Sequence, residues 1–290
     1  MYRAAPLAPT GATCDDGSMA FTSDVIDLER DGRVATLWLD RPEVRNALGR
    51  AFWRDLPRAV AAALAEPGVR CLVLAARGRD FTVGLDLKEA GGVLAPAAAG
   101  AHESLYESIR TMQASVTSLA EAPVPVIAAV HGYCLGGGVD LICACDVRLA
   151  SSDATFAVRE TRLAIVADLG TLERLPRIVG PGHAAELALT GRDIDAARAC
   201  AIGLVNHRVE GGADEVLAAA RAMAEEISAL SPRAVRGTKA VLRFNDQGDV
   251  EEGLVYVARW NAENLLGPDL REALTAFAER RAPEFADPEP

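Results

Sequence analysis

The chain has few aromatic residues and no excess of positive charge. Phe, Trp and Tyr make up 5% of its 290 residues, and 41 acidic side chains outnumber 30 basic ones, so the net charge is -11 at pH 7. A protein that neutralises nucleic-acid phosphates needs clustered Lys and Arg. The composition therefore argues against a nucleic-acid partner, although a local basic patch can still bind a small polyanionic ligand.

The cysteines form no CxxC pair and no evenly spaced framework. They are Cys14, Cys71, Cys134, Cys143, Cys145 and Cys200. Apolar or small residues surround them, which is typical of reduced, buried thiols in a cytosolic protein and not of disulfides or a zinc site.

Signals for membrane insertion and export are also missing. No stretch approaches the roughly 20 uncharged apolar residues of a membrane span, and the N-terminus lacks the charged-then-apolar order of a signal peptide. The last four residues, Asp-Pro-Glu-Pro, are not a peroxisomal address. We therefore expect a cytoplasmic protein with no membrane partner.

Common catalytic motifs are absent as well. The four histidines have no metal-like spacing, and neither a GxSxG elbow nor an SxxK motif occurs. The glycines match neither a Rossmann fingerprint nor a P-loop. The sequence therefore predicts no metal site and no serine nucleophile.

What is present is an alternation of short apolar segments with longer stretches of helical spacing. A turn at residues 31–32 between two apolar segments predicts a hairpin over 25–39. Further strands are predicted at 71–75, 124–130, 146–149 and 205–209, and helices at 49–65, 102–120, from about 137, and at 196–201, 213–230, 232–242, 250–266 and 270–280. This order indicates an α/β fold with ligand sites at the strand ends.

The same pattern divides the chain into three regions. Residues 1–20 are rich in Ala, Pro, Gly and Thr without an apolar period, which predicts a disordered tail. Residues 21–205 carry the strand-helix alternation and form the predicted α/β core. Helical spacing prevails over residues 206–290, which form the predicted helical C-terminal region.

The most informative feature is a set of three carboxylates, Asp140, Glu160 and Asp168, which follow the glycine run at 136–138. Glycines at a helix start leave backbone N–H groups bare, and such donors can stabilise a developing oxyanion. Carboxylates beside the apolar run at 163–167 would have raised pKa values and could act as general acid and base. The arrangement predicts proton transfer beside an anion.

Each acid also has an ordinary structural interpretation. Asp140 could be a first-turn acid that stabilises its helix by about 0.3 to 1 kcal/mol. Glu160 could be a surface partner of Arg159 or Arg162, and Asp168 could cap the segment that follows it. A second glycine loop, residues 81–88, could likewise be a plain turn. The occurrence of three acids together with two glycine loops favours catalysis.

These residues belong to a set of motifs that resembles the crotonase (enoyl-CoA hydratase/isomerase) superfamily from about residue 24 to 280. The motifs are Arg41-Pro42 with Arg45-Asn46-Ala47-Leu48, the loop 81–88, His131-Gly132 with 136–140, and Gly170-Thr171 with Arg174-Leu175-Pro176. The resemblance implies a crotonase-like spiral of ββα units with a helical C-terminal region that serves oligomerisation. It also implies a homotrimer or a dimer of trimers, and an acyl-CoA substrate that brings coenzyme A with it, so that no separate cofactor is expected.

The family resemblance assigns roles to individual residues. The backbone N–H groups of Leu85 and Gly137 match the oxyanion hole for the thioester oxygen. Hydratases of the family add water with two glutamates at the positions of Asp140 and Glu160, and they have a small residue, commonly Gly, at the position of Asp168. The chain departs from the hydratases at the first and third of these positions.

Those departures resemble the 3,5-2,4-dienoyl-CoA isomerase branch, as do residues 50–54, 84–87 and 167–171. This resemblance implies that Glu160 and Asp168 shuttle protons at C2 and C6 of a 3,5-dienoyl-CoA in fatty-acid β-oxidation, with support from Asp140. The alternatives are a 2-enoyl-CoA hydratase and a non-catalytic acyl-CoA-binding protein with the same fold.

The resemblance also implies where coenzyme A binds. It places Glu43, Val44 and Arg45 near the pantetheine and nucleotide, and Leu87 and Lys88 near the adenine. Arg45 or Lys88 could meet a phosphate. The helix at 102–120 and the loop at 91–100 are expected to shape the acyl pocket.

Overall fold

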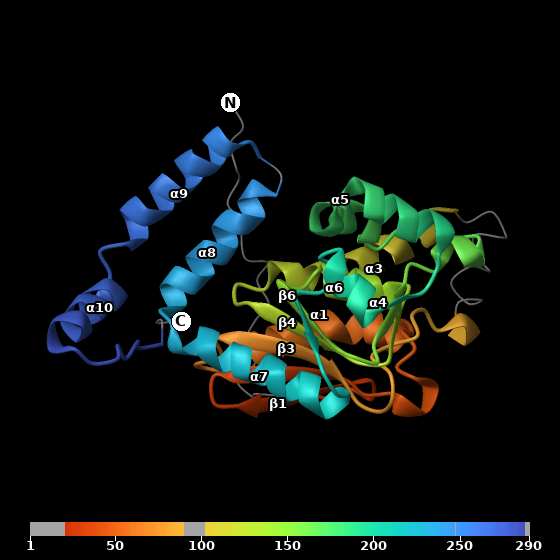
Figure 1. Cartoon of the computed structure of the whole chain (residues 1–290), viewed down its shortest axis with the longest axis horizontal. Helices are drawn as coiled ribbons and strands as arrows, with labels where there is room; N and C mark the ends of the chain where they lie inside the picture. The colour runs from red at the N-terminus through yellow and green to blue at the C-terminus, as the bar shows by residue number, and fades with distance from the viewer. Residues whose placement is uncertain (1–20, 90–101, 247, 288–290) are drawn as a thin grey trace.

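The computed structural model describes residues 21–89, 102–246 and 248–287 (Figure 1). The predicted tail at 1–20, the predicted pocket loop at 91–100 and Cys14 lie outside these residues. The described part is a mixed α/β structure, which confirms the predicted fold class.

The main sheet has six strands in the order β1-β2-β3-β4-β6-β9. The predicted hairpin is present, with β1 (Ile26–Asp31) antiparallel to β2 (Val34–Leu39). The other strands run parallel to β2: β3 (Cys71–Ala76), β4 (Val126–Val130), β6 (Val147–Ser151) and β9 (His207–Val209). Strands β3 and β4 are buried along their whole length, as expected for parallel strands covered on both faces.

A second, smaller sheet was not predicted from the sequence. It consists of β5 (Tyr133–Leu135), β7 (Thr155–Ala157) and β8 (Ile194–Asp195), with β5 parallel to β7 and β8 antiparallel to it. Segments of two or three residues are too short to show a period-2 pattern. This sheet carries the glycine turn that begins at Gly136, because the Gly136 N–H donates to the Ala157 carbonyl at 2.9 Å.

Helices cover both faces of the main sheet. One face packs against α7 (Ala213–Ala229), which lies across the sheet in Figure 1. The other face packs against a larger group that forms the main hydrophobic core. Its members are α1 (Arg50–Ala65), α3 (His102–Glu121), α4 (Gly137–Cys143), α5 (Thr171–Thr190, kinked at Gly180) and α6 (Ala196–Ala201).

Three C-terminal helices stand away from this core in Figure 1: α8 (Pro232–Asn245), α9 (Val250–Asn264) and α10 (Pro268–Glu279). The buried Lys239 of α8 attaches them, because its Nζ donates to the Val124 carbonyl at 2.9 Å and to Asp146 at 2.6 Å. The buried Arg70 holds the returning chain by donating to the Phe285 carbonyl at 2.7 Å.

The five described cysteines are free thiols. Four are buried and Cys200 is partly exposed, which agrees with the absence of disulfides predicted from their spacing. Within the described residues, no helix is both long enough and apolar enough to cross a membrane.

Candidate active site

The site is built around two backbone turns that touch. Gly84 has φ +86°, and a Cβ at this position would lie 2.7 Å from the Leu135 carbonyl oxygen. Only glycine fits such a close backbone approach at positive φ. The turn at 82–86 therefore packs directly against the turn that opens α4, and it brings Leu85 near Gly137.

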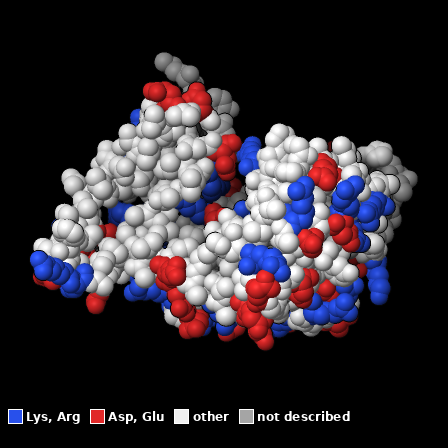
Figure 2. Space-filling view, viewed as in Figure 1, with Lys and Arg blue, Asp and Glu red and all other residues white. Residues whose placement is uncertain are grey.

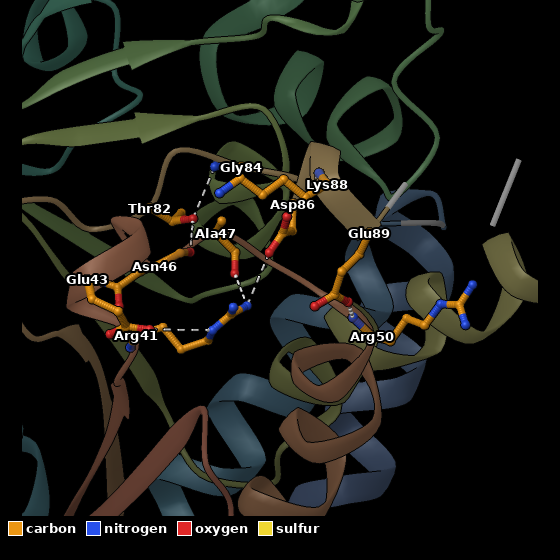
Figure 3. A network of polar contacts seen from close by, with 10 residues as sticks. All are labelled: Arg41, Glu43, Asn46, Ala47, Arg50, Thr82, Gly84, Asp86, Lys88 and Glu89. Carbon is orange, nitrogen blue, oxygen red and sulfur yellow. Dashed lines mark hydrogen bonds and ion pairs between the residues drawn. The ribbon is translucent and has the colours of Figure 1, made fainter. Parts of the chain in front are cut away.

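Polar contacts fix the 82–86 turn (Figure 3). The Thr82 hydroxyl donates to the Asn46 carbonyl at 2.6 Å and accepts from the Gly84 N–H at 3.1 Å. Arg41 pairs with Asp86 at 3.3 Å from the other side. These contacts hold the loop in one conformation before any ligand arrives.

Two backbone donors at these turns are left free. Among the described residues, neither the Leu85 N–H nor the Gly137 N–H has a hydrogen-bond acceptor. Gly137 begins α4, where the helix leaves its first N–H groups without intrahelical partners. A pair of free donors of this kind can bind an oxyanion.

Asp140 lies in the first turn of α4 and is only 1% exposed. Its Oδ1 accepts from the Thr171 N–H at 2.6 Å. Burial raises the pKa of Asp140 to about 7, against the lowering effect of contacts with Thr171, and the negative charges of Glu160 and Asp168 add to the rise. Asp140 therefore does lie in the first turn of its helix, as predicted, but its carboxyl binds the start of another helix, α5.

Glu160 begins the short 3-10 helix η2 (Glu160–Leu163) and points at the glycine turn. A Cβ on Gly136 would lie 3.3 Å from Glu160 Oε1, and Glu160 Oε2 is buried without a hydrogen-bond partner. Burial raises its pKa, and the charge of Asp168 raises it further. The surface-partner interpretation is wrong, because among the described residues neither Arg159 nor Arg162 forms an ion pair with Glu160, and Arg159 pairs with Asp193 at 2.6 Å.

Asp168 lies in the loop that leads into α5. Burial raises its pKa, and the charge of Glu173 contributes to the rise. The capping interpretation is wrong, because the N-cap of α5 is Gly170. The structure therefore brings all three predicted acids into one cluster, in which each has a raised pKa and the charge of Asp168 raises the pKa values of both Asp140 and Glu160.

The two predicted coenzyme A segments also lie together. Glu43 and Val44 belong to the 3-10 helix η1 (Pro42–Val44), and Leu87 and Lys88 follow the fixed turn. The Val83 N–H donates to the Arg45 carbonyl at 3.2 Å, which joins the two segments. The exposed side chains of Leu87 and Lys88 face solvent beside the site.

The Arg45 guanidinium makes contacts within the protein. Its Nε donates to Asp80 at 2.7 Å, and its Cζ lies 4.9 Å from the centre of the Tyr133 ring. This pair with Asp80 raises the pKa of Arg45. Arg45 therefore ties its own segment to the segment that carries Asp80, and its Nε is not free to bind a ligand.

The structure adds residues that the sequence motifs did not single out as functional. Thr171 binds Asp140, and Gln113 of α3 donates to the Asp168 carbonyl at 2.6 Å. The only signal for Thr171 was its place after Gly170 at a helix start. Contacts of this kind join segments far apart in the chain, so sequence spacing does not reveal them. Over residues 21–89, 102–246 and 248–287, no group of His, Cys, Asp and Glu side chains is arranged to hold a metal ion.

Comparison with known proteins identifies the class. The family model for enoyl-CoA hydratase/isomerase matches residues 29–288, and the chain belongs to this family. A solved structure, a putative enoyl-CoA hydratase from Streptomyces coelicolor A3(2), is 32% identical with a TM-score of 0.86 and covers 97% of this chain and 99% of its own. The predicted crotonase-like architecture is confirmed.

Two curated relatives narrow the resemblance to one branch. The peroxisomal Delta(3,5)-Delta(2,4)-dienoyl-CoA isomerase of Arabidopsis thaliana is 43% identical over 91% of this chain and 97% of its own. The mitochondrial enzyme of the same name from Dictyostelium discoideum is 43% identical over 87% of each. The predicted likeness to the dienoyl-CoA isomerase branch is confirmed.

The same relatives overturn the expected cytoplasmic location. They are named peroxisomal and mitochondrial, so the cytoplasmic prediction is wrong. It was drawn from missing signals and from the character of the thiols. Organelle receptors read short addresses, and neither composition nor core packing records them.

Proposed function

We propose that this chain converts 3,5-dienoyl-CoA into 2,4-dienoyl-CoA in fatty-acid metabolism. The observation that carries the proposal is the third acid: Asp168 shares a partly buried cluster with Asp140 and Glu160. Water addition by two acids leaves Asp168 without a task. The names of the curated relatives support the same activity.

In the proposed reaction the thioester oxygen of the substrate binds the N–H groups of Leu85 and Gly137. Removal of a C2 proton pushes the C–H electron pair toward the thioester, and the negative charge of the dienolate falls largely on that oxygen. Preorganised backbone donors stabilise this charge more than they stabilise the neutral ground state. The acidity of C2 rises accordingly.

Two carboxyls then handle the protons. Glu160, as carboxylate, takes the proton from C2, and Asp168, as carboxylic acid, gives a proton to C6. The double bonds move from C3 and C5 to C2 and C4, and the molecule gains and loses one proton in balance. The raised pKa values of both groups suit acid and base work near neutral pH.

Asp140 supports this pair in the proposal. The charges of Glu160 and Asp168 lie close enough to raise the pKa of Asp140, and the cluster retains a proton that no single exposed acid would hold at neutral pH. After each turnover a proton must return from Glu160 to Asp168, and a third carboxyl within the cluster eases that return.

We also propose that coenzyme A lies over the joined segments of η1 and residues 87–88. Glu43, Val44, Arg45 and Leu87 would line its pantetheine and adenine, and Lys88 would meet a phosphate. Lys88 is exposed, whereas the Arg45 guanidinium is paired with Asp80. These observations support Lys88, and not Arg45, as the phosphate contact.

A homotrimer or a dimer of trimers is proposed for the assembly, with α8 to α10 as its main contact surface. Phe277 is 84% exposed, Leu266 85% and Val250 80%. In the view of Figure 2, α8 and α9 carry few charged side chains apart from an acidic group at one end, whereas charged side chains are denser on the surface of the α/β part. Large apolar side chains that stand so exposed in one chain are typical of protein interfaces.

Ultraviolet absorbance tests the activity. A mixture of purified protein and 3,5-dienoyl-CoA should show a fast rise of the conjugated 2,4-dienoyl band. No rise, together with rapid loss of the 2-enoyl-CoA band in a parallel mixture, would make the protein a hydratase. No absorbance change with either substrate would favour the non-catalytic acyl-CoA-binding alternative.

A further inference from the structure

The loop at 168–171 carries one proposed proton-transfer group and holds another. Asp168 begins the loop, and Thr171 ends it as the first residue of α5. The Thr171 N–H donates to Asp140 Oδ1 at 2.6 Å. A displacement of this short segment would therefore move two of the three acids at once.

Helix α3 braces the loop at two points. Gln113 Nε2 donates to the Asp168 carbonyl at 2.6 Å. Arg174 Nη2, one turn into α5, donates to Thr117 Oγ1 at 3.0 Å. The backbone of the loop is thus held in place. At Thr171 the hydroxyl hydrogen can still rotate about the Cβ–Oγ1 bond.

That hydroxyl is in an unusual position. Thr171 is 0% exposed, and its Oγ1 has no hydrogen-bond partner. It lies near enough to the Asp140 carboxyl to lower the pKa of that group, but no hydrogen bond joins the two side chains. An unpaired buried hydroxyl is unfavourable, and hydrogen bonds of catalytic groups often tighten only when substrate binds.

We propose that Thr171 is a positioning residue whose hydroxyl completes a hydrogen bond to the Asp140 carboxyl in the substrate complex and so decides how readily Asp140 carries charge. A threonine hydroxyl can donate to a carboxylate and accept from a carboxylic acid. It therefore serves both states of Asp140 without movement of the backbone. This inference rests on the proposed isomerase function.

Other groups around Asp140 do not supply such a contact. Glu160 on η2 and Asp168 in the loop are both acids that raise its pKa. Cys134 on β5 and Cys143 on α4 have raised thiol pKa values because they are buried, so they stay neutral near pH 7. The charge of Arg174 of α5 lowers the pKa of the Cys143 thiol, and the Arg174 guanidinium donates to Thr117 and to the Leu169 carbonyl. The buried residues of α3 are uncharged.

Three variants separate this role from simple packing. Thr171→Val keeps the shape and the backbone N–H but removes the hydroxyl, whereas Thr171→Ser restores it. Thr36→Val removes a buried threonine hydroxyl from β2, beside Arg221 of α7 on the opposite face of the sheet. Thr171→Ala serves as the second deletion if the valine variant does not fold.

The pH profile of kcat, which reports groups in the enzyme-substrate complex, is the first measurement. Loss of the hydroxyl should move the acid limb upward by about one pH unit, because a contact that stabilises negative charge is gone. We expect Thr171→Ser and Thr36→Val to keep the wild-type limb. An unmoved limb in Thr171→Val, or an equal shift in Thr171→Ser, overturns the proposal.

A second measurement does not depend on turnover. The infrared C=O band of protonated Asp140, recorded with bound acyl-CoA and assigned by its loss in Asp140→Asn, should titrate at a higher pH in Thr171→Val than in the wild type. If the wild type fails to isomerise dienoyl-CoA, the proposed function falls but this titration still tests the link. Identical titrations in wild type and Thr171→Val refute the link even if the enzyme is active.

Discussion

The carboxyl of Asp140 and the backbone N–H of Thr171 are joined by a hydrogen bond of 2.6 Å. This contact ties the start of α5 to the first turn of α4, so the segment that carries Asp168 and the helix that begins at Gly137 are fixed relative to each other. Proton-transfer groups and oxyanion donors need such fixed geometry, because small displacements lower the rate steeply.

The raised pKa of Asp140 should make stability depend on pH. In the folded state its pKa is about 7, against an ordinary value of 3.8, because the charged form is buried. The folded chain therefore holds a proton that the unfolded chain loses between about pH 4 and pH 7, and stability falls as pH rises through this window. Asp140→Asn removes this dependence and still accepts from Thr171.

Urea unfolding at several pH values checks this prediction. Relative to wild type, Asp140→Asn should gain stability progressively from pH 4.5 to pH 8, by on the order of 4 kcal/mol at most. Asp214→Asn, which changes an exposed acid on the opposite face of the sheet, is the control and should show no such trend. A constant difference between wild type and Asp140→Asn across the range would contradict the buried-charge explanation.

Gly84→Ala should disable the oxyanion hole. The new Cβ would lie 2.7 Å from the Leu135 carbonyl oxygen at a backbone φ of +86°, so the turn must shift and carry the Leu85 N–H with it. Loss of one oxyanion donor lowers kcat by about 100-fold to 1,000-fold. Steady-state kinetics should show this loss in kcat with a smaller change in KM.

A matched glycine gives the control. Gly182 in α5 has open space around its Cβ position and no positive φ, so Gly182→Ala should keep full activity. Equal activity of Gly84→Ala and Gly182→Ala would remove Leu85 from the oxyanion hole.

Lys88→Ala should weaken coenzyme A binding by about 2-fold to 5-fold, because an exposed charge pair contributes little and is screened by salt. Calorimetry at low and high salt should show less salt dependence in the variant. Arg45→Ala should weaken binding as well, but with a loss of thermal stability, since Arg45 holds Asp80. Arg208→Ala on β9, at the far edge of the sheet from β2, is the control. Unchanged affinity and salt slope in Lys88→Ala would dismiss its phosphate contact.

Phe277→Asp should break the proposed assembly. The side chain is 84% exposed in one chain, and burial of such a ring against another copy favours association. Light scattering after size exclusion should find trimers or hexamers for wild type and for the conservative Phe277→Leu, but smaller species for Phe277→Asp. A monomeric wild type would contradict the assembly outright.

How much the sequence reveals depends on the length of each pattern. The long apolar run of β4 and the helical spacing of α7 were predicted to within about two residues of their observed ends, because each carries many informative positions. The two-residue β8 has no pattern of its own and forms only because β7 pairs with it. Short strands depend on tertiary pairing that sequence periodicity does not record.

The site shows the same division. The three acids could be found from their types and from the glycine turns beside them. The contact of Asp140 with Thr171 spans 31 residues, and the brace from Gln113 to Asp168 spans 55. Such contacts follow from packing between α3, α4 and α5, so the structure was needed to find them.

Asp168→Asn is the most direct test of the account, because Asp168 separates the proposed isomerase from a hydratase. The absorbance of the 2,4-dienoyl band is followed for wild type, for Asp168→Asn and for the control Asp214→Asn, with coenzyme A affinity measured on the same samples. The account predicts a loss of about 100-fold to 10,000-fold in the rate for Asp168→Asn alone, with unchanged affinity. Full isomerase activity in Asp168→Asn would contradict it.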